Sequence, residues 1–255
     1  MASIDDATGQ ITKAVFAANE GVVAVFTFWQ EYVLEIGKTL AIYLDKFSTY
    51  KINHKTAVDN QELMTQFERA MRQLGIELIS ANSPEAKGRV ERLFQTLQDR
   101  LVKEMRLATI VNPEQGNIFL REAFIPKFNS KFAVIPAKED NVHKQLLPDE
   151  KENLNHIFSI HETRRVNLDF TIQFKNNWYQ LTEMQSTTVR PLMTVLMETW
   201  LDQTVHIILK GHELASILLP EKPKKQRIKQ PIILTTHTLN YKPPPNHPWR
   251  RYPNK

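Results

Sequence analysis

The sequence predicts an α/β domain with a largely parallel sheet, followed by a small all-β unit and a basic tail. In the first part, apolar runs of strand length alternate with helically spaced stretches, in the order strand, helix, strand, helix, strand, helix. After residue 166 the apolar period changes to two, and turn-forming residues separate short β-rich runs. From Pro220 onward, proline, lysine and arginine dominate, which predicts a disordered or extended tail.

The elements of the first part follow from spacing and from their end signals. Gly37 and Gly75 stop the two amphipathic stretches before them, and Ser83-Pro84 has the form of a helix start, with serine as N-cap. A continuous apolar run that ends in Asp45 is typical of a strand covered on both faces of its sheet. The expected elements are a strand over 11–17, a helix over 22–36, a strand over 40–44, a helix over 63–74, a strand over 76–80 and a helix from Pro84 to Met105.

The second part is expected to contain a mixed segment and then a small barrel. Helical pieces and a connector between Pro136 and Pro148 are expected within residues 108–166. Short strands with turns between them suggest a small barrel. The predicted strands are 167–174, 178–182, 189–200, 204–209 and 213–218. The predicted domains are a catalytic core over 1–125, a connector over 126–166, the barrel over 167–220 and the tail over 221–255.

Composition excludes several classes of protein. The chain has no cysteine, which rules out disulfides and thiolate metal sites and fits a reducing compartment. No basic n-region precedes an apolar stretch at the N-terminus, and no apolar run approaches the ~20 residues that span a bilayer. We therefore expect a soluble, cytoplasmic protein.

The positive charge is concentrated in the tail. Residues 221–255 hold nine Lys or Arg against one acid, Glu221, so their net charge is +8. Because the whole chain carries +5, the other 220 residues carry −3. The tail is suited to phosphate backbones, whereas the body is not uniformly basic.

Two carboxylates have positions that could serve metal-ion chemistry. Asp45 closes a predicted buried strand, at the end of the sheet where ligands of open α/β sheets gather. Glu91 lies at the border of the apolar face of the following long helix. Hard divalent cations take oxygen ligands, so the pair could hold Mg²⁺ or Mn²⁺. The alternative is structural: Asp45 only terminates its strand, and Glu91 is a solvated helix residue.

Several segments occur in the order found in the retroviral-integrase-like catalytic core. The segment Gly-x-x-Glu-Arg that leads into an amphipathic helix is the most specific, and the ending His-Pro-Trp-Arg-Arg adds to the similarity. The chain resembles DDE-type insertion-sequence transposases of the unclassified (ISNCY) group over essentially its whole length. The segments that carry the resemblance are Asp5-Asp6-Ala7-Thr8-Gly9, Tyr43-Leu44-Asp45-Lys46, Leu74-Gly75-Ile76-Glu77 and Ser83 to Arg92.

The resemblance implies a fold, a reaction and site residues. The implied fold is a ribonuclease H-like core followed by a small SH3-like barrel. By it, Asp45 is the second catalytic aspartate and Glu91 the catalytic glutamate, both ligands of a two-metal site for Mg²⁺ or Mn²⁺. The implied reaction cleaves DNA at the transposon end and joins the new 3′-hydroxyl to target DNA. Lys87, Arg89 and Arg92 would contact DNA phosphates; the alternative is that they are ordinary solvated charges.

The chain departs from the family pattern at its start. The resemblance places the first catalytic aspartate on a central strand upstream of the Asp-Asp-Ala-Thr-Gly turn, so we expect an N-terminally truncated core without cleavage activity of its own. Asp5 and Asp6 are assigned to the turn itself, where aspartate is favoured for backbone reasons. Glu85, in the first helical turn, is a weaker rival to Glu91. Without the strand we expect poor solubility, self-association or association with a full-length transposase.

Other functions remain open at this point. The chain could be a non-catalytic DNA-binding or transposase-interacting protein, or a ribonuclease H-like nuclease that acts on RNA. The histidine pairs His156/His161 and His206/His212 do not have zinc-site spacing without cysteines, so we interpret them as surface or strand residues.

Overall fold

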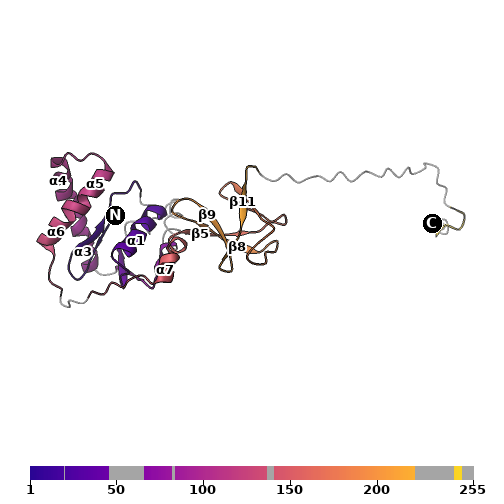
Figure 1. Ribbon diagram of the computed structural model, residues 1–255, viewed down its shortest axis with the longest axis horizontal. Coiled ribbons are helices and arrows are strands. Elements are labelled where there is room, and N and C mark those ends of the chain that lie inside the picture. The colour runs from indigo at the N-terminus through magenta and orange to yellow at the C-terminus, as the bar shows by residue number, and fades with distance from the viewer. Residues whose placement is uncertain (20, 46–65, 82–83, 137–140, 222–243, 249–255) are drawn as a thin grey trace, which may run out of the picture.

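The computed structural model describes residues 1–19, 21–45, 66–81, 84–136, 141–221 and 244–248. In this part of the chain, a hairpin, a parallel pair of strands and a group of helices come first, and two antiparallel sheets follow (Figure 1). The expected mixed α/β character is therefore present, but among the described residues the strands of the first part form an antiparallel hairpin and a separate parallel pair, and not one largely parallel sheet.

The chain opens with a β-hairpin in which β1 (Ala2–Ile4) pairs antiparallel with β2 (Ile11–Ala14). Asp5 closes the turn: its Oδ2 accepts hydrogen bonds from the Thr8 backbone N–H at 2.9 Å and from the Thr8 hydroxyl at 2.5 Å. Gly9 has a φ of 68°, a left-handed conformation that glycine adopts without strain. The predicted hairpin turn is confirmed, and the side chain of Asp5 stabilises it by accepting hydrogen bonds from Thr8.

An α/β layer follows. It consists of α1 (Val22–Glu35), β3 (Ala41–Asp45), helical residues 66–73 and β4 (Glu77–Ala81). The two strands are parallel, and a parallel pair needs a crossover connection, in which the helical residues lie. All four elements match the predicted ones to within one residue at the ends that the structure describes.

The long helix predicted from Pro84 is present, but it is not uniform. A π-helical turn interrupts it, and a second group of helices packs beside its end (Figure 1). The successive segments are α3 (Pro84–Thr96), η1 (Leu97–Leu101), α4 (Val102–Leu107), α5 (Pro113–Phe119), η2 (Leu120–Phe124) and α6 (Ile125–Phe132), of which η1 and η2 are π-helical.

Two short helices lead to the all-β unit. They are α7 (Pro148–Glu152) and α8 (Leu154–Ile157). The strands that follow are β5 (Ile160–Arg165), β6 (Thr171–Phe174), β7 (Asn177–Leu181), β8 (Thr194–Thr199), β9 (Val205–Leu209), β10 (His212–Glu213) and β11 (Ser216–Leu219). They form a four-stranded sheet in the order β10-β9-β8-β5 and a three-stranded sheet in the order β11-β7-β6.

These strands do not close into one barrel within the described residues. The ribonuclease H-like core and the SH3-like barrel stay predictions, because strand order and pairing alone do not assign either name. The five β-rich runs expected after residue 166 each contain a strand, although the run over 167–174 is strand only from Thr171 and the run over 189–200 only from Thr194.

β5 was not expected from the sequence. Its residues, Ile-His-Glu-Thr-Arg-Arg, lack the apolar alternation of a half-buried strand. The strand exists because it pairs along its whole length with β8, from Ile160 opposite Thr199 to Arg165 opposite Thr194. Tertiary pairing thus overrides a weak local signal.

Three buried clusters hold the structure together. The first joins α1, the helical residues 66–73, β3 and α8; the second fills the space between the two antiparallel sheets; the third joins β2 to the helices from α3 to α6. The segment 126–166 contributes to all three clusters: Leu146, Leu154 and Phe158 to the first, Val166 to the second and Phe128 to the third.

Candidate active site and DNA interface

Asp45 lies where the sequence places it, at the carboxyl end of β3. In the parallel pair its register partner is Ala81, the last residue of β4, and α3 begins three residues later at Pro84. The start of α3 is therefore next to the sheet end that carries Asp45. The side chain of Asp45 lies outside the described part of the structure.

Glu91 lies in the middle of α3, and its side chain is exposed. Leu93, two residues further on, is buried in the third cluster, so α3 turns one face to the protein and leaves Glu91 at the surface. Seven residues separate Pro84 from Glu91, which is about two helical turns or roughly 10 Å along the axis. The structure thus brings the sheet end with Asp45 and the helix with Glu91 into one region, and the pairing of the two carboxylates stays a prediction.

The predicted DNA contacts lie on the same helix. Arg92 is exposed, and its Nε donates a hydrogen bond to the carbonyl oxygen of Gly88 at 2.8 Å, so the guanidinium remains at the surface. The side chains of Lys87, Arg89 and Glu85 lie outside the described residues. Among the described residues, no group of three His, Asp or Glu side chains has an arrangement that could hold a metal ion.

Sequence reasoning missed a polar cluster around Glu198 on β8. Glu198 is 96% buried, since only 4% of it is exposed. Its Oε2 lies 2.6 Å from His156 Nδ1 and accepts a hydrogen bond from Trp200 Nε1 at 3.3 Å, and its Oε1 lies 3.4 Å from His161 Nε2. The signal in the sequence is an acid directly after the apolar run Val195-Leu196-Met197, on the strand face opposite the core residues Val195 and Met197.

The helical residues 66–73 of the α/β layer reach this cluster. The amide of Gln66 donates to the carbonyl oxygen of His161 at 2.7 Å and accepts from its backbone N–H at 3.1 Å. Arg69 donates from Nη2 to the carbonyl oxygen of Ser159 at 2.6 Å. We call Gln66, Arg69, His156, His161 and Glu198 the Glu198 network.

Two groups of the Glu198 network have shifted pKa values. Burial lowers the pKa of Arg69 to about 10, and the negative charge of Glu198 partly offsets this effect. Burial also lowers the pKa of His161, and the positive charge of Arg69 lowers it further, whereas Glu198 acts in the opposite direction. His161 Nε2 lies 3.1 Å from the carbonyl oxygen of His156, which can only accept, so Nε2 carries the proton in the neutral ring.

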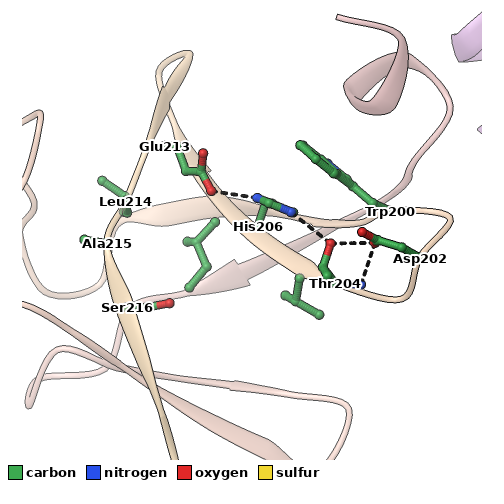
Figure 2. Close-up of a pocket in the computed structure, with 10 residues that line it drawn as sticks. Trp200, Asp202, Thr204, His206, Glu213, Leu214, Ala215 and Ser216 are labelled. Atoms are coloured by element: carbon green, nitrogen blue, oxygen red, sulfur yellow. Dashed lines mark hydrogen bonds and ion pairs between the residues drawn. The ribbon is translucent and has the colours of Figure 1, made fainter.

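A second polar group lies at the edge of the same sheet, in a pocket of about 470 Å³ (Figure 2). His206 stacks on Trp200 with ring centroids 3.7 Å apart. Its Nδ1 lies 2.6 Å from Glu213 Oε1 and its Nε2 3.0 Å from the hydroxyl of Thr204, which donates to Asp202 at 2.6 Å. His161 and His206 are strand residues, as the sequence suggested, whereas His156 lies on helix α8.

No helix among the described residues is both long and apolar enough to cross a bilayer.

Two curated proteins are similar to the chain over nearly its whole length. A protein of Sinorhizobium fredii (strain NBRC 101917 / NGR234) that is named as a transposase, y4bF, is 36% identical over 241 residues, which cover 93% of this chain and 50% of that protein. The transposase for insertion sequence IS1202 of Streptococcus pneumoniae is 30% identical over 264 residues, which cover 97% of this chain and 53% of that protein. No family model matches the chain.

The chain therefore spans about half the length of the curated relatives it matches. These comparisons confirm the similarity to insertion-sequence transposases that the motifs predicted.

Proposed function

We propose that the chain is part of a DNA-recombining enzyme that cleaves DNA at a transposon end and joins it to target DNA. The observation that carries the proposal is its similarity to two transposases over 93% and 97% of its length. The position of Asp45 at the end of β3, beside the start of the helix that bears Glu91, supports it. The proposed fold of this part is a ribonuclease H-like core.

The donor atoms at this sheet end fit a hard divalent cation. Carboxylate oxygens are the ligands that Mg²⁺ and Mn²⁺ prefer, and Glu91 lies at the surface of α3. Asp45 and Glu91 would hold the metal. When bound, such ions activate the attacking oxygen and stabilise the leaving oxygen in phosphoryl transfer.

The remaining chain would bind and orient DNA. Lys87, Arg89 and Arg92 lie on α3 within one turn or so of Glu91, so their charges would contact phosphates next to the reacting one. The tail, with its net charge of +8, adds a sequence-independent attraction for the DNA backbone. The proposed partners are therefore transposon-end and target DNA and further transposase chains.

By the resemblance, the proposed site takes a third carboxylate, an aspartate on a further strand, beside Asp45 and Glu91. We expect residues 1–255 alone to show no cleavage, and an in-frame polypeptide that adds the strand with its aspartate to be active.

The experiment is a strand-transfer assay on the extended polypeptide, with labelled transposon-end DNA and Mg²⁺ or Mn²⁺. Asp45→Asn and Glu91→Gln should each abolish joining, because each removes a metal ligand, while DNA binding in a chelator is retained. Glu114→Gln, at an exposed acid on α5, is the matched control and should leave joining unchanged. Full activity of either site variant contradicts the assignment.

A second candidate is a non-catalytic DNA-binding protein or one that interacts with a transposase. The basic tail favours it, because that charge attracts DNA whether or not the metal site is complete. A strong chelator separates the two: DNA binding and inhibition of an active transposase survive the chelator, whereas strand transfer stops.

A further inference from the structure

Glu198, which is buried, and His161 and Arg69, which are half-buried, form a set of ionisable groups that the proposed chemistry does not use. The first two come from the four-stranded sheet, and Arg69 comes from the helical residues 66–73, which pack on the strands of the α/β layer. The set therefore lies where the α/β layer meets the all-β unit.

The contact is built from both sides. The side chain of Gln66 binds both the backbone N–H and the C=O of His161. These two groups of His161 therefore point away from β8 and do not pair with it. His161 and its register partner Glu198 are thus a non-hydrogen-bonded pair, the type that brings opposite side chains closest in an antiparallel ladder. The same glutamine that joins the two parts thus binds the backbone of the residue opposite Glu198.

The charges at this contact depend on one another. Arg69 is half-buried: its Nη1 and Nη2 donate to Gln73 Oε1 and to the Ser159 carbonyl oxygen, its Nε has no hydrogen-bond partner among the described residues, and the nearby carboxylate of Glu198 favours its positive charge. Among the described residues, the carboxylate of Glu198 lies close to the rings of His156, Trp200 and His161, and its charge acts on Arg69. Removal of either charge leaves the other buried without compensation, which separation of the two parts would relieve through hydration.

We propose that the Glu198 network is a joint that fixes the all-β unit against the α/β layer, and that protonation of His161 opens it. The groups that face the His161 ring are Arg69 from the helical residues 66–73, His156 from α8 and Glu198 from β8. A proton on this ring places a second positive charge beside Arg69 in a half-buried site. The inference does not rest on the proposed function, since it concerns only the packing of the two parts.

The direction of the pH effect follows from the pKa. The joined arrangement keeps the His161 pKa below its ordinary value of 6.5, which a separated arrangement restores. The open form therefore binds the proton more tightly, and its population rises relative to the closed form as the pH falls below that value. For one proton, the ratio of open to closed molecules rises by up to about tenfold per pH unit in this range.

The test is a distance measurement between spin labels on the two parts. Because the chain has no cysteine, Leu34→Cys on α1 and Gln173→Cys on β6, both at exposed positions, give two defined labels. Distances are measured by double electron–electron resonance at about pH 7.5 and about pH 5, on either side of the ordinary histidine pKa. The labelled chain is the full chain, extended in frame if that is needed for solubility.

We expect one narrow distance distribution at the higher pH and an added, longer population at the lower pH. His161→Gln should remove the pH response, and Glu198→Gln should broaden the distribution at both pH values. The matched controls are His212→Gln on β10 and Glu162→Gln on the opposite face of β5, which should behave like the parent. Identical distributions for the parent at both pH values, or a parent-like Glu198→Gln variant with native circular dichroism, overturn the proposal.

Discussion

Replacement of Phe158 by alanine should lower the free energy of unfolding more than a conservative substitution at the protein surface does. Phe158 is fully buried and packs edge-on against Phe26, with ring centroids 5.7 Å apart. It directly follows α8 and precedes β5, so the ring fastens the link between the α/β layer and the all-β unit.

The magnitude follows from the size of the ring and its surroundings. A fully buried phenylalanine cut back to alanine costs about 3–5 kcal/mol, from lost burial and from the cavity that remains. The aromatic pair with Phe26 is lost as well, which favours the upper part of this range. A loss of this size lowers the folding equilibrium constant by about two to four orders of magnitude, and it is comparable to the whole stability of a small domain.

The assay is urea unfolding followed by tryptophan fluorescence, with Trp29 as the probe that packs against the same cluster. Phe158→Leu should lose less than half as much free energy of unfolding, since most of the volume is kept. Leu168→Ala, at a side chain that is 75% exposed, should change it by less than about 0.5 kcal/mol. A Phe158→Ala variant within about 1 kcal/mol of the parent would refute the assignment of this ring to the core that joins the two parts.

Two further predictions concern single polar side chains. Asn129→Ala should lower the free energy of unfolding by about 1–3 kcal/mol. The reason is that the Asn129 side-chain amide binds both the N–H and the C=O of Ile11, at 2.8 and 3.0 Å, and so connects α6 to β2. Ser130→Ala, at the exposed neighbouring position, is the control. Asn112→Ala should cost about 1 kcal/mol, because its side chain caps α5 by accepting from the Gln115 backbone N–H at 2.8 Å. Asn112→Asp should retain the stability, and an equal loss in both Asn112 variants would show that the cap does not stabilise the helix.

Local sequence signals are sufficient to predict the helices and strands of the α/β layer. Gly37 was expected to end the first amphipathic helix, and α1 does end just before it, at Glu35. Gly37 has a φ of 106°, and a Cβ there would lie only 2.9 Å from the carbonyl oxygen of Lys144, so both conformation and packing require glycine. The continuous apolar runs before Asp45 and after Gly75 likewise became β3 and β4.

Tertiary effects account for what the sequence did not reveal. β5 is polar and forms only because β8 pairs with it, and the expected strand over 189–200 starts late because Leu192, with a φ of 67°, lies in a turn. The Glu198 network could not be foreseen, because its residues come from positions 66 to 198 and meet only through folding. For Asp45 and Glu91, sequence order predicted elements and positions, whereas the approach of their carboxylates depends on the packing of α3 against the sheet end.

The two hydrogen bonds between Gln66 and the backbone of His161 have a consequence for association between molecules. Among the described residues, β5 is an edge strand of its sheet. An edge strand presents unpaired backbone N–H and C=O groups that can pair with a strand of another molecule. Gln66 occupies these groups at His161, and the strand then continues into Arg164 and Arg165, whose like charges repel a second copy of the same border. Gln66 and the two arginines thus hinder pairing of β5 with a strand of another molecule. Loss of Gln66 would favour aggregation through β5.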